Sequence, residues 1–336
     1  MTTLIKPKGY HSQLDIKETE KAIKFVRQRF EEKFADVLNL SRVSSPLFLQ
    51  PETGLNDNLS GKENAVSFHV KDADNAKVEI VHSLAKWKRT ALNDYGYEYG
   101  EGIYTNMNAI RAEEELSNLH SIYVDQWDWE KIITEEERTE QQLQQVVKKI
   151  FRIFQEIEWN LSNEYAYIEP ILPDEISFIS TQELEDRYPH LTPKERENEI
   201  AKEKKAVFIT QIGGPLHSGN KHDDRSPDYD DWTLNGDILF WYPVLDQAIE
   251  MSSMGIRVDQ AALVRQLKEA DCEDRLTLDY HKMVLGNELP YTIGGGIGQS
   301  RACLFLLRKA HIGEVQASVW SKEIIEECKS SGIQLL

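Results

Sequence analysis

The sequence predicts an α+β fold in which a largely antiparallel sheet is flanked by helices. Strand-like segments outnumber candidate crossover helices in the second half of the chain, which argues against a regular alternation of parallel strands and helices. Helical periodicity is concentrated in a few separate segments. The 336 residues contain no internal repeat and no linker rich in Pro, Gly or Ser, so we expect a single domain over residues 1–336.

The first predicted element is an amphipathic helix over residues 16–38. Its apolar residues recur at spacings of three and four, at Ile23, Val26, Phe30, Phe34 and Val37. The following segment, residues 40–47, alternates in polarity and contains Pro46. Because proline cannot donate a backbone hydrogen bond, this segment suits the edge of a sheet.

Two further helices carry capping signals at their start. One is predicted to begin at Thr134, with Glu137 completing a capping box, and to run through Leu161. The other begins at Thr192, is followed by a proline at its first helical position, and should end near Lys205.

Strands are predicted from short runs rich in β-branched and aromatic residues. These runs cover residues 78–82, 121–130, 206–212, 237–242 and 251–258. A glycine-rich strand over residues 293–298, with the helix that follows it, is expected to close the sheet.

Composition and charge limit the classes of partner. The chain has 57 acidic and 39 basic residues, a net charge of −18, which repels polyanions, so we expect no nucleic-acid partner. The longest apolar run, residues 302–307, is too short to span a bilayer and the first 20 residues resemble no export signal, so we expect no membrane partner and a cytoplasmic location. The three cysteines form no C-x-x-C pair and are expected to be reduced thiols.

The segment 293–301, IGGGIGQSR, combines a glycine cluster with an arginine. It matches neither a P-loop nor the G-x-G-x-x-G fingerprint of a dinucleotide-binding unit. Taken alone, the pattern is as typical of close packing between a strand and a helix as of contact with a nucleotide.

Three other clusters have a chemical interpretation and a structural one. Arg111 leaves a predicted strand just before Glu113 and Glu114, and an arginine there could bind a phosphate with two hydrogen bonds or simply lie in a charged surface turn. Asp237 and Glu250 are expected to project into one cleft from adjacent strands. The loop 217–232 carries five aspartates, which would be either solvated or directed at an amine.

In chain order, these features resemble the motifs of the class II aminoacyl-tRNA synthetase catalytic domain. Arg111 with Glu113 or Glu114 resembles motif 2, and the glycine run ending in Arg301 resembles motif 3. Pro46 resembles the proline of motif 1 at the dimer interface of that family. Longer strings resemble the aspartate-ammonia ligases, the ammonia-using asparagine synthetases: GLNDNLSG at 54–61, VHSLAKWKR at 81–89, YVDQWDWE at 123–130, SPDYDDW at 226–232 and EMSSMGIR at 250–257.

This resemblance implies a single catalytic domain that makes asparagine. In that family aspartate and ATP form β-aspartyl adenylate and pyrophosphate, and ammonia then displaces AMP. The implied partners are aspartate, ATP and ammonia, the implied cofactor is Mg²⁺, and the implied assembly is a homodimer.

The resemblance also implies a role for each matching residue. The catalytic residues would be Asp57, Arg111 and Arg301, with Asp57 attracting ammonium and accepting its proton. The ATP-binding residues would be Arg111, Glu113, Asp237, Arg257, Gly294, Gly296 and Arg301. The aspartate-binding residues would be Ser83, Lys88, Gln126, Asp128 and Asp230, with Asp128 or Asp230 holding the amino group. The Mg²⁺ ligands would be Asp237, Glu250 and Ser253, which are hard oxygen donors.

Two other functions are compatible with the same motifs. One is a synthetase paralogue that transfers an activated amino acid to tRNA or to a protein lysine, although the charge of −18 argues against tRNA. The other is a regulatory subunit that binds amino acid or nucleotide without catalysis, although such a protein is expected to lose groups such as Arg111 and Arg301. Glutamine is not expected to serve as the nitrogen donor, because no cysteine lies in a recognisable catalytic setting.

Overall fold

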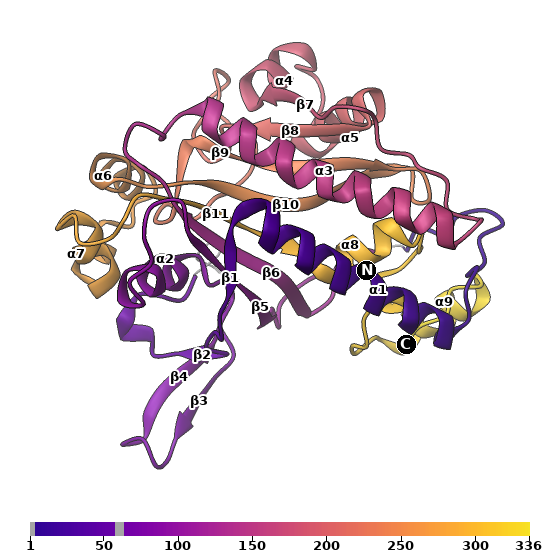
Figure 1. Cartoon of the computed structure of the whole chain (residues 1–336), viewed down its shortest axis with the longest axis horizontal. Coiled ribbons are helices and arrows are strands. Elements are labelled where there is room, and N and C mark those ends of the chain that lie inside the picture. The colour runs from indigo at the N-terminus through magenta and orange to yellow at the C-terminus, as the bar shows by residue number, and fades with distance from the viewer. Residues whose placement is uncertain (1–3, 58–63) are drawn as a thin grey trace.

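The computed structural model describes residues 4–57 and 64–336. Within these residues an eight-stranded sheet has the order β1-β5-β6-β11-β10-β9-β8-β7 (Figure 1). The two outermost pairs, β1/β5 and β7/β8, are parallel and every pair between them is antiparallel. The strands are β1 (Leu40–Arg42), β5 (Gly102–Ile110), β6 (Tyr123–Ile132), β7 (Ser177–Ser180), β8 (Ala206–Thr210), β9 (Asp230–Tyr242), β10 (Gln247–Arg257) and β11 (Thr292–Gly298). The predicted largely antiparallel sheet is therefore confirmed.

One face of the sheet is covered by α1 (Ile16–Leu38) and α3 (Glu140–Glu164), which cross it side by side (Figure 1). Phe30 of α1 stacks on Trp127 of β6 with ring centroids 4.3 Å apart. Phe154 of α3 packs edge-on against Phe240 of β9 at 5.2 Å. These rings form the centre of the main hydrophobic core.

Apolar spacing predicted one helix correctly, and the capping signals predicted a second correctly and misplaced the start of a third. As predicted, α1 spans residues 16–38, and α5 (Pro193–Lys204) begins after Thr192. The Glu137 carboxylate accepts a hydrogen bond from the Thr134 amide at 3.0 Å, but this pairing closes a turn, and α3 begins only after Thr139. Arg138, which follows Glu137, stabilises this turn because its guanidinium forms ion pairs with the carboxylates of Asp231 at 3.0 Å and Asp259 at 3.1 Å.

The glycine-rich strand occupies a different place from the one expected. It does not close the sheet at an edge but lies in the middle, between β6 and β10. The helix that follows it, α8 (Gln299–Leu306), packs with α1 and α3. Three consecutive glycines, residues 294–296, face both neighbouring strands where little room is left for side chains.

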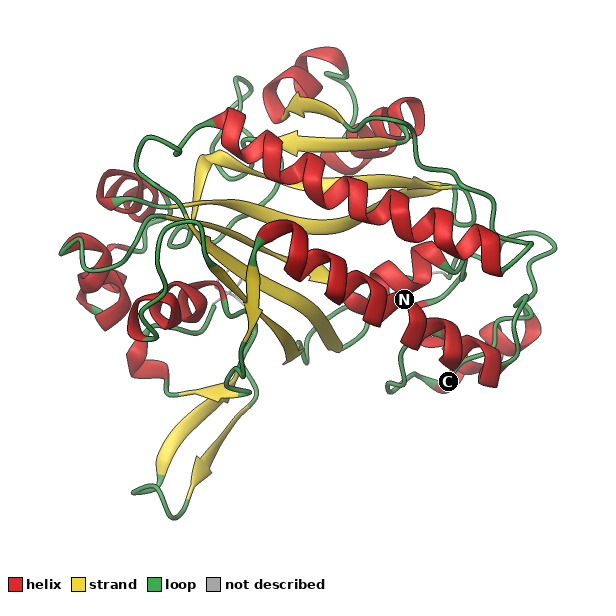
Figure 2. Ribbon diagram, viewed as in Figure 1, coloured by secondary structure: helices red, strands yellow, loops and turns green. Residues whose placement is uncertain are grey.

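The remaining elements surround this framework (Figure 2). A small sheet projects away from the main body and is built from β2 (Phe48–Leu49), β4 (Ala76–Ile80) and β3 (Ser67–Val70). The other helices are α2 (Ala85–Asp94), α4 (Thr181–Arg187), α6 (Gln260–Glu269), α7 (Asp279–Leu285) and α9 (Lys322–Ser330), with short 3-10 turns at Pro51–Thr53, Glu273–Thr277 and Ile312–Glu314. Among the described residues, no helix combines the length and apolar character that a membrane crossing requires.

Candidate active site

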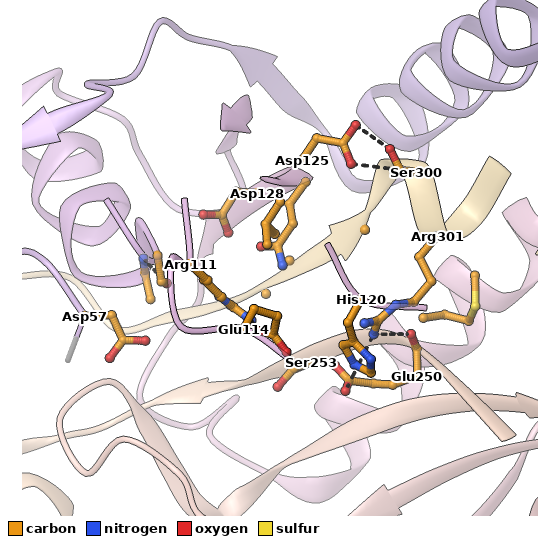
Figure 3. A pocket seen from close by; sticks show the side chains of 18 of the residues that line it. Asp57, Arg111, Glu114, His120, Asp125, Asp128, Glu250, Ser253, Ser300 and Arg301 are labelled. Carbon is orange, nitrogen blue, oxygen red and sulfur yellow. Dashed lines mark hydrogen bonds and ion pairs between the residues drawn. The ribbon is translucent and has the colours of Figure 1, made fainter. Parts of the chain in front are cut away.

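A cavity of about 340 Å³ opens on the sheet face opposite α1 and α3. Figure 3 shows many of its side chains converging from different elements. Of the residues predicted for the site, the cavity is lined by Asp57, Ser83, Lys88, Arg111, Gln126, Asp128, Asp230, Glu250, Ser253, Arg257, Gly296 and Arg301. Glu113, Asp237 and Gly294 are not among its lining residues.

Strand β6 supplies the floor of the cavity through its alternation. Trp127 and Trp129 are fully buried in the core on one face, so Gln126 and Asp128 point to the other. The neighbouring strand pairs Gly296 with Asp128 in register. A Cβ atom at Gly296 would lie 2.4 Å from the Gln126 amide oxygen, so the glycine gives these polar side chains their space.

A buried lysine and aspartate meet at this floor. The Lys88 ammonium group, on α2, donates hydrogen bonds to the Asp128 carboxylate and to the Gly295 carbonyl, the latter at 3.2 Å. Burial lowers the pKa of Lys88, although Asp128 acts in the opposite direction. The second carboxylate oxygen of Asp128 has no hydrogen-bond partner, so it is an acceptor available to a bound amine.

Arg257 lines the cavity, and its guanidinium is engaged by two buried carboxylates. Its side chain is 2% exposed and donates to Glu130, with the closest pair at 2.7 Å, and to Asp230. Burial alone would raise the pKa of Glu130, but Arg257 outweighs burial and holds it below the usual value. A Cβ at Gly294 would lie 2.1 Å from a Glu130 oxygen, so Gly294 makes room for this ion pair and does not line the cavity.

Asp57 lies at another side of the cavity and is 3% exposed. The Tyr229 hydroxyl donates to its carboxylate at 3.3 Å. Asn56 holds the backbone beside it, because its side-chain oxygen accepts from the amides of Asp57 at 3.0 Å and His82 at 2.9 Å. Residues 58–61 of the predicted motif lie outside the described residues.

Asp237, Glu250 and Ser253 gather at the junction of β9 and β10. Asp237 and Ser253 are directly opposite each other in register. Arg225 donates to one oxygen of the Asp237 carboxylate, and the other oxygen is buried without a hydrogen-bond partner. Burial raises the pKa of Asp237 to about 7, and the neighbouring Glu250 contributes to the rise.

The predicted arginines Arg111 and Arg301 line the cavity from different elements (Figure 3). Arg301 donates to the Glu250 carbonyl at 2.9 Å, and its guanidinium lies 3.8 Å from the Glu250 carboxylate. The Arg111 guanidinium lies 4.0 Å from the carboxylate of Glu114, which also lines the cavity. Glu113 is exposed and accepts from the Asn64 amide group at 3.0 Å, so Glu114 takes the place expected of Glu113.

The acidic loop is solvated in part, and one of its carboxylates is buried among cations of the protein. Asp223 and Asp224 are exposed, as in a solvated loop. Asp228 is fully buried and accepts hydrogen bonds from Arg275 at 3.1 Å and His281 at 3.0 Å. Burial would raise the pKa of Asp228, but the surrounding cations lower it well below the usual range.

Several residues of the site escaped prediction. Asp125 and Tyr229, which line the cavity, and Glu130, which pairs with Arg257, lie inside the quoted strings, where their alternation or spacing could have singled them out. Arg225 and His120 carry no local sequence signal for their place at the cavity. The pKa of His120 is lowered to about 4, first by desolvation and then by the charge of Arg301.

Comparisons with known proteins agree on one family. A family model described as aspartate-ammonia ligase matches residues 17–332. The aspartate–ammonia ligase of Ruminiclostridium cellulolyticum is 62% identical over 336 residues and covers 100% of both chains. Those of Clostridium perfringens (strain 13) and Levilactobacillus brevis are 59% identical over 336 residues, with 100% of both chains covered, and 58% identical over 333 residues, with 99% of both covered.

Solved structures show the same fold at low sequence identity. Asparaginyl-tRNA synthetase from Pyrococcus horikoshii, complexed with asparaginyl-adenylate, matches with a TM-score of 0.66 at 14% identity, over 90% of this chain and 70% of that one. Aspartyl-tRNA synthetase from Entamoeba histolytica matches with a TM-score of 0.61 at 17% identity, over 89% and 58%. The predicted fold of a class II synthetase catalytic domain is thereby confirmed. By its sequence along nearly the whole length, the chain belongs to the aspartate-ammonia ligase family.

Proposed function

We propose that this protein makes asparagine from aspartate and ammonia at the expense of ATP, through a β-aspartyl adenylate. The family membership supports the overall reaction. The observation that carries the proposal is the cavity itself, which is lined both by the buried pair Lys88–Asp128 and by the cations Arg111 and Arg301. Such a site suits a small zwitterion beside a polyphosphate.

The buried Lys88–Asp128 pair would bind aspartate. The Lys88 ammonium group would bind a carboxylate of the substrate, and the unpartnered oxygen of Asp128 would accept from its amino group. Ser83 and Gln126, which line the same region, would complete the polar contacts. Asp230 is a weaker candidate for the amino group because Arg257 already neutralises it.

Arg111 and Arg301 would bind ATP and promote the first step. One oxygen of the aspartate β-carboxylate bonds to the α-phosphorus, the bond from that phosphorus to the bridging oxygen breaks, and pyrophosphate leaves. The attack brings anions together, so fixed positive charge on Arg111 and Arg301 would stabilise the transition state. The Glu114 carboxylate, which lines the cavity, would accept from the adenine amino group in place of Glu113.

The residues at the β9/β10 junction fit a magnesium ion that ATP brings with it. Among the described residues, no three or more His, Cys, Asp or Glu side chains are arranged to hold a metal by themselves. Mg²⁺ typically takes one or two carboxylates and completes its shell with phosphates and water, and the orphaned oxygen of Asp237 offers such a ligand. Asp237, Glu250 and Ser253 would hold the ion, which supplies positive charge to the phosphates when bound.

Asp57 would serve the second step. At neutral pH almost all ammonia is present as the ammonium cation, so a carboxylate must attract this cation and take a proton from it. The nitrogen then attacks the β-carbonyl carbon, the bond to the phosphate oxygen breaks, and AMP leaves. Tyr229, which donates to Asp57 at 3.3 Å, would orient the carboxylate.

We further propose that the protein acts as a cytoplasmic homodimer. Support comes from Pro46, which resembles the dimer-interface proline of class II synthetases, and from an open groove lined by α1 and by Tyr104 of β5. Light scattering on the purified protein would measure the mass, and a value of one chain would contradict the dimer.

The function is tested by incubating the protein with ATP, Mg²⁺, aspartate and ammonium while AMP, pyrophosphate and asparagine are measured. One arm omits ammonium and another replaces it with glutamine. We expect AMP and asparagine in equal amounts, only with ammonium. Adenylate formation without asparagine would indicate a different acceptor, and absence of ATP turnover would indicate a regulatory protein.

A further inference from the structure

Asp125, at the start of β6, is a buried carboxylate that takes no direct part in the proposed chemistry. It bonds to Arg27 of α1, is 5% exposed and is also among the residues that line the cavity. It accepts hydrogen bonds from the Ser300 amide at 3.0 Å, the Ser300 hydroxyl at 2.7 Å and the Arg27 guanidinium at 2.7 Å. Gln316 adds a longer contact at 3.4 Å.

These bonds cap a helix that lacks a cap of its own. The N-cap residue of α8 is Gly298, which has no side chain to accept from the first amides. Asp125 supplies the missing acceptor from another strand, and its negative charge lies at the end of the helix where it is most favourable. The position of the first turn of α8 therefore depends on Asp125.

Arg301 is the third residue of this helix and directly follows Ser300. Its guanidinium enters the cavity and donates to the Glu250 carbonyl at 2.9 Å (Figure 3). We propose that Asp125 is a positioning residue that fixes Arg301 in the cavity through Ser300. The inference rests on the proposed role of Arg301 in binding ATP.

Asp125 acts through Ser300 because its own oxygens are already engaged. The ion pair with Arg27 offsets its charge, and the two bonds to Ser300 occupy both carboxylate oxygens. Arg27 lies on α1 with its side chain 33% exposed, so the same carboxylate also joins the N-terminal helix to the start of α8. Loss of the charge on Asp125 would loosen Ser300 first and Arg301 with it.

The first test compares Asp125→Asn with the matched variant Glu158→Gln. Glu158 is likewise buried and accepts from two backbone amides, those of Ile171 at 3.1 Å and Leu172 at 3.2 Å, and from Arg308, but it does not line the cavity. We expect both variants to lower Tm, whereas only Asp125→Asn raises KM for ATP, by about tenfold, with KM for aspartate unchanged. An equal change in both KM values would indicate a general structural role and overturn the inference.

The second test is a double-mutant cycle with Arg301→Ala. If Asp125 acts through Arg301, Asp125→Asn produces no further rise in KM for ATP once Arg301 is truncated. If Asp125→Asn raised KM for ATP by the same factor in the wild type and in Arg301→Ala, the inference would be overturned. Ser300→Ala keeps the amide bond to Asp125 and loses the hydroxyl bonds to Asp125, Arg27 and Gln316. We expect a smaller rise in KM for ATP, and this variant serves if Asp125→Asn does not fold.

The two proposals fail in different ways. Wild-type protein that forms no aspartyl adenylate would contradict the proposed function. An Arg301→Ala variant with normal KM for ATP would contradict the role of Arg301 and this inference with it. A defective Arg301→Ala beside a normal Asp125→Asn would overturn only the inference.

Discussion

The Lys88 ammonium group and the Asp128 carboxylate form an ion pair at the floor of the cavity, with both side chains almost completely buried. A buried charge whose partner is removed is strongly destabilising, because neither water nor another group replaces the partner. The pair therefore stabilises the fold while it presents a cation and an anion to one substrate.

Replacing Lys88 with methionine should impair stability and aspartate binding together. We expect the free energy of unfolding to fall by about 3–5 kcal/mol, measured by urea denaturation. KM for aspartate should rise while KM for ATP stays near the wild-type value. Lys309→Met is the control, because Lys309 is also buried but bonds to the Ser12 and Thr19 hydroxyls. Normal aspartate binding in Lys88→Met would contradict the assignment.

Replacing Asp57 with asparagine should separate the two steps of the reaction. A positioned base contributes about 10²–10⁴-fold, so we expect asparagine formation to fall by that range. Aspartate-dependent exchange of pyrophosphate into ATP should stay nearly unchanged, because adenylate formation does not use this base. Tyr229→Phe removes the hydrogen bond at 3.3 Å and should cause a smaller loss in the same step. Equal losses of exchange and synthesis would rule out the role of Asp57.

The pKa of about 7 for Asp237 predicts opposite effects of pH on folding and on ATP binding. Between its ordinary pKa of 3.8 and 7, the folded state keeps a proton that the unfolded chain has lost, so its contribution to stability falls as pH rises through this window. Magnesium needs the charged carboxylate, so Mg²⁺-dependent ATP affinity should rise from pH 6 to 8.

This pH dependence is checked by titrating ATP at several pH values, with and without Mg²⁺, in wild type and Asp237→Asn. The variant should bind Mg²⁺–ATP weakly, and its ATP affinity should change less over the same pH range. If the ATP affinity of Asp237→Asn depends on pH as in the wild type, another group titrates.

Alanine at two of the glycines in β11 should give contrasting defects. At Gly294 the new methyl group would meet a Glu130 oxygen at 2.1 Å and the Trp129 carbonyl at 2.6 Å, so we expect a loss of about 3–5 kcal/mol as the buried Arg257 ion pair is displaced. At Gly296 it would meet only the flexible end of Gln126 within 3.0 Å, so stability should change little while KM for aspartate rises.

Urea denaturation and initial rates on both glycine variants would test this contrast. Gly214→Ala is the control, since no heavy atom lies within 4 Å of the added Cβ. Equal stability of the Gly294 and Gly296 variants would contradict the account of close packing in β11.

Local patterns predicted the elements whose signals lie within a few residues. The bounds of α1 follow from its apolar spacing, and α5 follows from Thr192 and the proline after it. The start of α3 did not follow, because Thr134 and Glu137 form their hydrogen bond in a turn that Arg138 ties to distant carboxylates. A capping signal reports a local hydrogen bond and not the continuation of a helix.

For the site, most of the residues that the resemblance identified line the cavity, but the resemblance did not predict their ion pairs. Arg257 is neutralised by Glu130 and Asp230, which come from other strands, so its charge is not free. Whether Glu113 or Glu114 faces the cavity depends on the path of one turn. Such facts depend on register between strands that are distant in sequence.

The central place of β11 has a consequence for how the chain is made. Strands β1, β5 and β6 form one half of the sheet and β7 to β10 the other, and β11 joins them only after residue 292 has been synthesised. Until then a nascent chain on the ribosome carries two unpaired inner edges, on β6 and β10, which can pair with other chains. The last strand to be translated thus completes the sheet and the cavity together. A chain truncated before β11 would lack the site and keep two unpaired strand edges that are prone to aggregation.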